Sequence, residues 1–195
     1  EALVDRMPLD LAGIEARAGV AIVEGGLTLG RVVAAEREPA LDGCGTALIS
    51  ARLEGKPGDA DQRLGAWGAA TIAYLAGLAR GALDTTVTYV RAREQFGAPL
   101  SELPTMQARL ADAALAADGL ELAAWAAAAS TDFPEGELLW AGTVAREVTA
   151  SAQQAHGGVG FALESGLHRF YRRAKSVQVW TREAVRAAAS AEPFG

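Results

Sequence analysis

Cysteine and lysine are nearly absent from this sequence. The single cysteine, Cys44, excludes an internal disulfide framework and fits a reducing, cytoplasmic environment. Only Lys56 and Lys175 are lysines, and the formal net charge is -6 with a pI near 5.0. Because no basic stretch outweighs the acidic background, the composition gives no support to nucleic-acid binding, and we expect no nucleic-acid partner. Phosphate groups would have to be bound locally, by arginines.

Long apolar runs are also absent. No apolar stretch approaches the length of a membrane span, and no signal-peptide pattern opens the chain. Half of the residues are hydrophobic, and 195 residues are enough for one sizeable domain or for one domain with part of a second. We therefore expect a cytoplasmic globular protein with no membrane span.

The chain changes character near residue 60. Up to about residue 58 the sequence has short β-prone runs broken by Gly, Pro and Asp. Residues 56–59, Lys-Pro-Gly-Asp, are typical of a loop, and from Leu64 the apolar period becomes helical. We predict a partial β domain over residues 1–60 and a helical-bundle domain over residues 61–195. The β-prone runs are residues 20–23, 27–34 and 46–53.

The second part of the chain is dominated by helical periodicity. Ser101 is positioned to cap the second predicted helix with Pro104 inside its first turn, and Pro134 is positioned to start the third. Short connections make neighbouring helices antiparallel. The predicted fold class is mainly α, a C-terminal antiparallel four-helix bundle preceded by part of a β domain. The helices are expected over residues 61–93, 102–130, 135–156 and 164–191, with the last either continuous or broken.

Three stretches indicate a binding site at the helix ends. Residues 154–160 read Gln-Ala-His-Gly-Gly-Val-Gly, so a helix up to His156 would stop at glycines that allow left-handed backbone and close approach of another group. Residues 93–97 read Arg-Glu-Gln-Phe-Gly at the end of the first long helix. Residues 167–175 add a basic helix that ends in Arg-Arg-Ala-Lys. A helix that stops at glycines can hold a ligand against bare peptide groups.

Taken together, these stretches resemble the acyl-CoA dehydrogenase family. In that family a Gln-x-x-Gly-Gly-x-Gly loop touches FAD, an Arg-x-x-Phe-Gly element grips its pyrophosphate, and a basic Arg-x-Ala-Lys helix follows. The Leu-Ala-Asp of residues 110–112 continues the pattern. Each block alone is weakly specific, but the blocks occur here in the family's order. The resemblance implies a bundle of acyl-CoA dehydrogenase type, an FAD cofactor and an oxidoreductase of lipid metabolism.

The resemblance also implies which residues bind FAD. In the family the ADP part of each FAD reaches across to a neighbouring subunit, and the two matched blocks make that contact. A guanidinium is a planar fork of donors that matches pyrophosphate oxygens, so Arg93 suits this role better than a lysine would. Without a ligand, the helix macrodipole would also favour Arg93, and Gly157 would be a plain helix cap. The expected cofactor-binding residues are Arg93, Gln95, Phe96, Gln154, His156, Gly157 and Gly158.

The catalytic base of the family is missing from both places where the resemblance would put it. The family reaction removes a proton next to the thioester carbonyl, and family members carry the required glutamate either just after the Arg-x-Ala-Lys helix or early in the first long helix. Those positions correspond to Thr181 and Trp67, and neither side chain can act as the base. Glu183 would point about 200° away from Thr181 on a helix. We therefore assign no catalytic residue.

We also expect no metal site in this sequence. His156 and His168 lie too far apart to form a local pair of ligands. Glu164 and His168 form one i, i+4 pair, but the other carboxylates that a bundle metal site needs are missing.

The pattern is typical of the base-lacking subunit of a heterotetrameric bacterial acyl-CoA dehydrogenase. The implied partners are a related subunit that carries the glutamate (α2β2), a fatty or sterol-side-chain acyl-CoA, and an electron-transfer flavoprotein or similar acceptor. Sterol catabolism is the implied context. Two alternatives stay open: a homotetrameric enzyme whose base lies outside these residues, and a flavin-free structural or assembly subunit.

Overall fold

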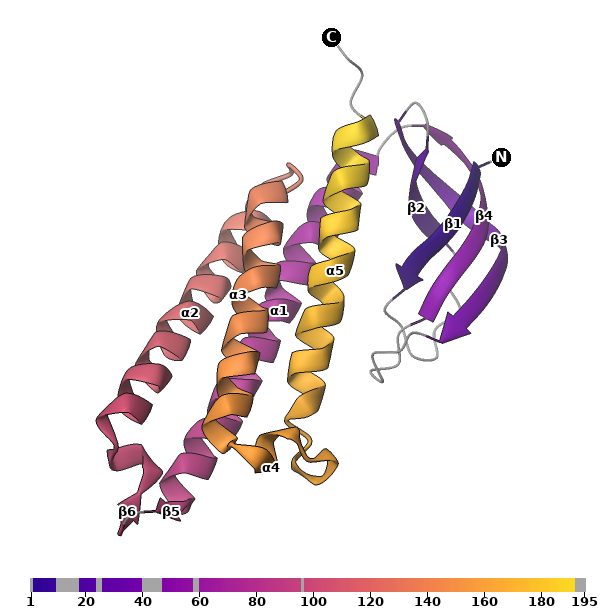
Figure 1. Cartoon of the computed structure of the whole chain (residues 1–195). Helices are drawn as coiled ribbons and strands as arrows, with labels where there is room; N and C mark the ends of the chain where they lie inside the picture. Colours follow the sequence, from indigo (N-terminus) through magenta and orange to yellow (C-terminus); the bar gives the residue numbers. More distant parts are fainter. Residues whose placement is uncertain are drawn as a thin grey trace.

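The computed structural model describes residues 2–9, 18–23, 26–39, 47–57, 60–95 and 97–191. The N-terminal part forms an antiparallel sheet in the order β1-β4-β3-β2 (Figure 1). The long strand β3 pairs with β2 on one side and with β4 on the other. The strands are β1 (Ala2–Leu9), β2 (Ala18–Val23), β3 (Gly26–Pro39) and β4 (Ala47–Pro57).

The β-prone runs of the sequence correspond to β2, β3 and β4, whereas β1 was not predicted. The interpretation of Lys56 and Pro57 as a loop was wrong, because both residues belong to β4. They pair with Leu29 and Thr28 of β3. Because β3 is the longer strand, its pairing extends β4 through these two residues, although Lys-Pro-Gly-Asp locally favours a turn. Strands β2 and β3 contact helix α5, and β3 also contacts helix α1, both described next.

The rest of the chain is an antiparallel four-helix bundle, as predicted (Figure 1). Helix α1 is connected to α2 by a short hairpin and a 3-10 turn. The hairpin consists of β5 (Glu94–Gln95) and β6 (Ala98–Pro99), and the turn is η1 (Leu100–Glu102). The short helix α4 (Gly158–Phe161) and the turn η2 (Leu163–Ser165) connect α3 to α5. The long helices are α1 (Ala60–Ala92), α2 (Pro104–Ala128), α3 (Glu135–His156) and α5 (His168–Ala191).

The starts of the helices follow the predicted proline positions but not the predicted serine cap. Pro104 is the first residue of α2, and Pro134 immediately precedes α3. Ser101 lies inside η1, and Leu103 occupies the N-cap of α2 without a side-chain cap. The extra 3-10 turn displaces the helix start by two residues, so the serine cannot reach the free N–H groups of α2.

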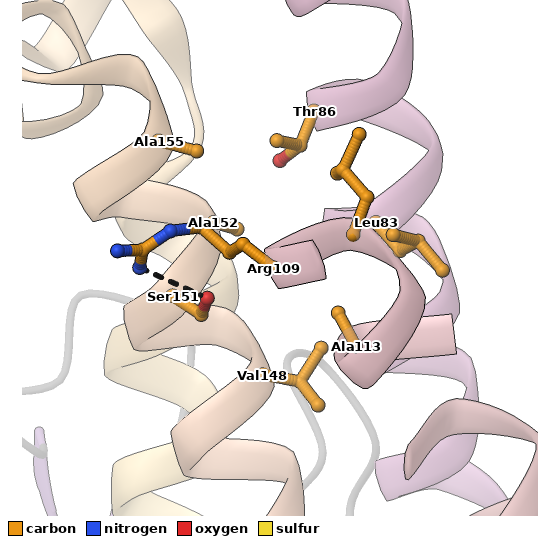
Figure 2. Close-up of a pocket in the computed structure, with 9 residues that line it drawn as sticks. Leu83, Thr86, Arg109, Ala113, Val148, Ser151, Ala152 and Ala155 are labelled. Atoms are coloured by element: carbon orange, nitrogen blue, oxygen red, sulfur yellow. Dashed lines mark hydrogen bonds between the residues drawn. The ribbon is translucent and has the colours of Figure 1, made fainter. Parts of the chain in front are cut away.

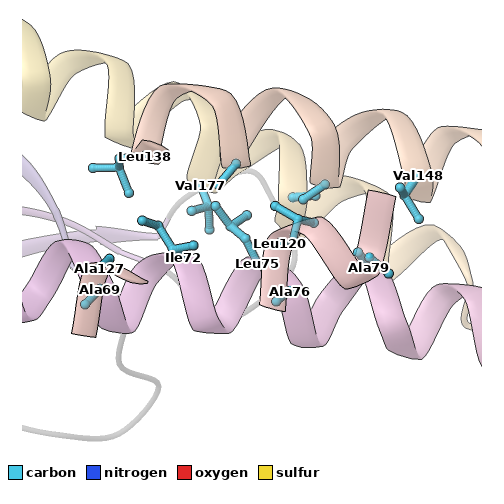
Figure 3. Close-up of a cluster of buried hydrophobic side chains, with 14 of the residues drawn as sticks. Ala69, Ile72, Leu75, Ala76, Ala79, Leu120, Ala127, Leu138, Val148 and Val177 are labelled. Carbon is cyan, nitrogen blue, oxygen red and sulfur yellow. The ribbon is translucent and has the colours of Figure 1, made fainter. Parts of the chain in front are cut away.

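A large apolar core cluster holds the bundle together (Figure 3), and a smaller cluster contains Ala82, Ala152 and Leu167. Ile72 and Leu75 of α1, Leu120 of α2 and Leu138 of α3 are fully buried. Val177 brings α5 into the same cluster. Between them lie small side chains that let the helices approach closely, namely Ala76, Ala79, Ala117, Ala141 and Ala145. Among the described residues, no helix is both long and apolar enough to cross a bilayer.

The core predicts a strong response to a single truncation. We expect Leu138→Ala to lower the free energy of unfolding by about 2–5 kcal/mol, because the side chain is fully buried and its removal leaves a cavity. Urea unfolding followed by circular dichroism measures this change. The matched control, Leu163→Ala, removes a leucine that is 72% exposed and should change stability by less than about 0.5 kcal/mol. Equal effects of the two changes would contradict the assigned core.

Candidate functional site

The two sequence blocks that predict a binding site lie at the same end of the bundle. Helices α1 and α3 pack side by side and both end there, α1 at Ala92 and α3 at His156. Figure 1 shows the β5-β6 hairpin that follows α1 and the helix α4 that follows α3 at this end. The fold therefore brings together segments that are about sixty residues apart in the sequence.

The segment after α1 is a tight hairpin that leaves its polar side chains exposed. The N–H of Arg93 donates to the carbonyl of Tyr89 at 2.9 Å, and the carbonyl of Arg93 accepts from Leu100 at 2.8 Å. Gly97 turns the chain with a φ of 85°. Arg93 and Gln95 are exposed, and no carboxylate of the described residues pairs with Arg93. Phe96, the third predicted residue of this block, lies outside the described residues.

The three glycines after α3 differ in whether the structure requires glycine at that position. Gly157 ends α3 with a φ of 62°, a conformation that other residues rarely adopt. A Cβ on Gly160 would lie 2.5 Å from the carbonyl oxygen of Gln153 and 2.9 Å from Cβ of His156. Gly158 has neither constraint, since a Cβ there would meet nothing within 4 Å. The chain's own packing therefore does not require glycine at position 158, which leaves a bare stretch of backbone beside exposed Gln154.

His156 lies in the interior of this helix end rather than on its surface. The residue is only 7% exposed. Its Nδ1 lies 2.9 Å from the carbonyl oxygen of Ala152, so Nδ1 carries the proton and donates this bond. The imidazole stacks on the ring of Tyr89, with centroids 4.1 Å apart and planes 21° apart. The structure thus gives His156 a clear supporting role in the loop.

Tyr89 is the important residue that the sequence reasoning missed. It lies one turn before Arg93 on α1, and its hydroxyl donates to the carbonyl of His156 at 3.5 Å. This carbonyl lies in the last turn of α3, where backbone acceptors have no intrahelical partner. Tyr89 therefore joins the end of α1 to the end of α3. The signal available in the sequence was an aromatic residue at i-4 from Arg93, which alone is not distinctive.

A second arginine lies next to the predicted surface. Nη1 of Arg109 on α2 donates to Oγ of Ser151 on α3 at 3.3 Å, and Ser151 is one turn before Gln154 (Figure 2). Beneath Arg109 is a cavity of about 10 Å³ between α1, α2 and α3, which has room for about one water molecule. This cavity is too small for a cofactor or an acyl chain, so the candidate site is a surface at the bundle end.

The basic motif on α5 is partly exposed and partly buried. Arg172 and Lys175 are exposed, and Lys175 donates to Oε1 of Gln178 at 3.2 Å. Arg173 is buried, its Nε donates to the hydroxyl of Tyr74 at 2.7 Å, and its guanidinium lies 5.1 Å from the ring centroid of Trp180. Burial lowers the pKa of Arg173 below its ordinary value. Arg173 therefore anchors α5 to α1.

Neither of the positions expected for a catalytic base carries a carboxylate. Thr181 is 1% exposed, and its hydroxyl donates to the carbonyl of Gln178 at 3.1 Å. Helix α5 continues through Thr181 to Ala191. Trp67 packs against Phe133, with ring centroids 6.4 Å apart. Glu183 lies on the exposed side of α5 and pairs with Arg186 at 2.7 Å, in agreement with its predicted direction away from Thr181.

Comparison with known proteins identifies the family. A family model described as "Acyl-CoA dehydrogenase, C-terminal domain" matches residues 60–181. The chain belongs to the acyl-CoA dehydrogenase family. The match begins with α1 and ends at Thr181, so it covers the predicted binding surface and reaches the position expected for the base.

Curated relatives of this acyl-CoA dehydrogenase family member match over part of their length. The chain is 40% identical over 114 residues to 3-sulfinopropanoyl-CoA desulfinase of Paraburkholderia xenovorans. This match covers 55% of this chain and 29% of the relative. It is 38% identical over 111 residues to the mitochondrial short-chain specific acyl-CoA dehydrogenase of Bos taurus, covering 53% of this chain and 27% of the relative. The matched part thus spans less than a third of these relatives.

Solved structures share the fold at low sequence identity. The Tcur3481-Tcur3483 steroid acyl-CoA dehydrogenase aligns with a TM-score of 0.70 and 22% identity, covering 89% of this chain and 54% of the other. Butyryl-CoA dehydrogenase from Megasphaera elsdenii aligns with a TM-score of 0.70 and 21% identity, covering 89% and 55%. These alignments include the sheet as well as the bundle, because they extend over more of the chain than the family model does.

The Tyr89–His156 stack predicts a graded response to mutation. Tyr89→Ala should lower the free energy of unfolding by about 1–3 kcal/mol, because it removes both the aromatic stack and the buried part of the ring. Tyr89→Phe keeps the stack and should cost at most about 1 kcal/mol for the lost hydroxyl bond. Urea unfolding gives both values, and amide exchange at Gly157 to Gly160 reports on the loop itself. Equal costs for the two variants would show that the hydroxyl, and not the stack, joins the helix ends.

Proposed function

We propose that this chain is the base-lacking subunit of an FAD-dependent acyl-CoA dehydrogenase. It contributes a surface for the ADP part of FAD, while a related subunit supplies the catalytic glutamate. The observation that carries the proposal is a contrast between the position expected for the base and the residues expected to bind the cofactor. Thr181 is buried in a continuous helix where the base is expected, whereas Arg93 and Gln154 are exposed at one end of the bundle.

The exposed residues fit an adenosine diphosphate group. Arg93 has no carboxylate partner among the described residues, so its guanidinium is free to bind pyrophosphate oxygens in a bidentate manner. Gln154 offers a donor and an acceptor to a ribose or flavin edge. The open space at Gly158 lets a ligand approach the backbone without a side chain in the way. Gln95, Gly157 and the supporting His156 complete the proposed set, with Phe96 assigned from the sequence.

The proposed division of labour follows from the side chains that this subunit lacks. FAD, when bound, supplies the hydride acceptor for the α,β-dehydrogenation of an acyl-CoA. Proton removal next to the thioester needs a carboxylate, and neither Thr181 nor Trp67 can provide one. In this proposal the present chain binds and orients the cofactor's ADP part, and the base of the related subunit removes the proton.

The proposed partners follow from the same reasoning. A heterotetramer of two base-lacking and two base-carrying subunits would give each FAD one surface of each kind. The substrate is a fatty or sterol-side-chain acyl-CoA, and the electron acceptor is an electron-transfer flavoprotein or a similar protein. The steroid dehydrogenase among the structural neighbours supports the choice of a sterol-derived substrate by fold alone.

A second candidate is a reaction of a CoA thioester other than dehydrogenation. The relative with 40% identity is a desulfinase by name, so the family's C-terminal domain also serves a reaction that removes a sulfinate group. The absence of a carboxylate at Thr181 and Trp67 is compatible with this alternative. Release of sulfite from a sulfinylated acyl-CoA, without reduction of an artificial electron acceptor, would favour it over the proposed dehydrogenase.

The cofactor surface can be tested by flavin content. We expect Arg93→Ala, in a complex co-purified with the base-carrying subunit, to weaken FAD binding by roughly tenfold or more and so to lower FAD occupancy, because a charge-assisted contact worth about 1.5–3 kcal/mol is lost. Flavin absorbance per complex after gel filtration measures the occupancy. Arg186→Ala is the matched control, since Arg186 is exposed on α5 and pairs with Glu183. Unchanged FAD content in Arg93→Ala would reject the assignment.

The absence of a base at position 181 predicts tolerance of substitution. Thr181→Ala should leave the turnover of the complex within about twofold, because the hydroxyl only bonds the carbonyl of Gln178 within α5. The assay is reduction of an artificial electron acceptor by the co-purified complex with saturating acyl-CoA. Circular dichroism of the same preparation checks that α5 is intact. A loss of turnover of a hundredfold or more with an intact fold would place Thr181 in the chemistry.

A further inference from the structure

Two arginines near the candidate surface have no acidic partner. Arg93 follows α1 and Arg109 lies in the second turn of α2, and neither pairs with a carboxylate of the described residues. Elsewhere on the bundle, Arg80, Arg146 and Arg186 do pair with carboxylates. The chain carries a formal net charge of -6, so acidic groups are not scarce. Arginines that stay unpaired in such a chain are available to an anionic ligand.

The side chain of Arg109 crosses from α2 to α3 (Figure 2). Its Nη1 donates to Oγ of Ser151 at 3.3 Å. Asp112 is an exposed carboxylate three residues further along α2, a spacing that suits an ion pair on a helix, but the two residues form none. The guanidinium is therefore directed toward the end of α3 and not toward the acidic side chain on its own helix.

Arg109 is thereby placed beside Gln154. Ser151 and Gln154 are three residues apart on α3, so their side chains lie on the same side of the helix. Arg93 is fixed near the start of α2, because its carbonyl accepts from the N–H of Leu100 in the turn that leads into this helix. Helices α1, α2 and α3 also pack against one another. Arg93, Arg109 and Gln154 therefore lie at the same end of three packed helices.

The contact that holds Arg109 can be exchanged for a stronger one. A separation of 3.3 Å is long for a hydrogen bond from nitrogen to oxygen, and the acceptor is a neutral hydroxyl. A phosphate group offers shorter bonds, roughly twice as strong, and accepts two parallel bonds from a guanidinium. Because Arg109 is exposed, its guanidinium can turn from Ser151 to a ligand without leaving a buried charge unpaired.

The charge of the proposed ligand requires a second cation. The diphosphate bridge of FAD carries two negative charges, and Arg93 supplies one positive charge. Arg91 is exposed in the last turn of α1, but it lies on the wrong side of the helix. Tyr89 faces α3 through its stack on His156, and Arg91 is two residues further on, about 200° around α1. Arg109, which already reaches α3, is on the side where Gln154 lies.

We propose that Arg109 is the second cationic contact of the candidate cofactor surface. Its guanidinium leaves Ser151 when a ligand arrives and binds the diphosphate of an adenosine diphosphate group together with Arg93. This inference rests on the proposed function of the surface and adds to it a residue outside the sequence blocks that predicted the site. The class of ligand is a nucleoside diphosphate, here the ADP part of FAD.

The experiment is a calorimetric titration of the purified full chain with ADP and, separately, with adenosine. We expect Arg109→Gln to weaken ADP binding by roughly tenfold, because charge-assisted bonds to phosphate are replaced by neutral ones. Adenosine has no phosphate, so its binding should change by less than about twofold. Arg91→Gln is the matched control, since it removes the same charge from the same end of the bundle, and ADP binding should again change by less than about twofold at physiological salt. Circular dichroism verifies that each variant is folded.

A change at Ser151 separates a direct contact from a supporting role. If Arg109 binds the ligand itself, Ser151→Ala leaves ADP binding unchanged or makes it tighter, because the arginine no longer has to leave the serine. If Arg109 only braces α2 against α3, Ser151→Ala weakens ADP binding as much as Arg109→Gln does. That second result, or an equal loss of adenosine binding in Arg109→Gln, would overturn the proposal.

The same titration of Arg93→Ala distinguishes failure of this inference from failure of the proposed function. A loss of ADP binding in Arg93→Ala with none in Arg109→Gln overturns the role of Arg109 and supports the cofactor surface. Unchanged binding in both variants overturns both. A wild-type chain that does not bind ADP also overturns the role of Arg109, and the flavin content of the Arg93→Ala complex then decides on the cofactor surface independently.

Discussion

The contact between Tyr89 and His156 is the constraint on which the candidate site depends. It links the ends of α1 and α3, which are followed by two separate segments of the chain, the β5-β6 hairpin and the α4 segment. The stack, the hydroxyl bond to the carbonyl of His156 and the imidazole bond to Ala152 act on the same helix end. They fix the position of Gln154 relative to Arg93, since each lies within one turn of a stacked ring.

The sequence was sufficient to predict the bundle because its signals are local. The helix that ends at Gly157 and the helix starts at Pro104 and after Pro134 follow from backbone preferences of single residues. Two errors arose where a non-local partner overrides the local preference. Lys56 and Pro57 lie in β4 because they pair with residues of β3. Ser101 does not cap α2 because it lies in a 3-10 turn that precedes the helix. The division of the chain into two domains stays a prediction.

The residue types of the candidate site were predictable, but the contacts among its residues were not. Gln154, Gly157 and Arg93 are visible as a motif, yet nothing in the sequence distinguishes Gly158, which has open space around it, from Gly160, which has none. The distinction depends on where Gln153 and His156 lie after folding. Tyr89 was invisible for the same reason: its partner is 67 residues away and is recognised only by proximity.

The environment of Thr181 disfavours a carboxylate at this position. A Cβ on Gly142 of α3 would lie 3.3 Å from the hydroxyl of Thr181 and 3.2 Å from Cα of Gln178, so α3 and α5 are in close contact at this level. A carboxylate in place of Thr181 would enter a contact with almost no exposed surface, and its charge would be costly to bury. Helix α5 also continues past this point to Ala191 instead of ending in a loop. In the proposed subunit the carboxylate therefore comes from another chain, whereas Arg93 and Gln154 are exposed at the end of the bundle, where the proposed ligand would bind.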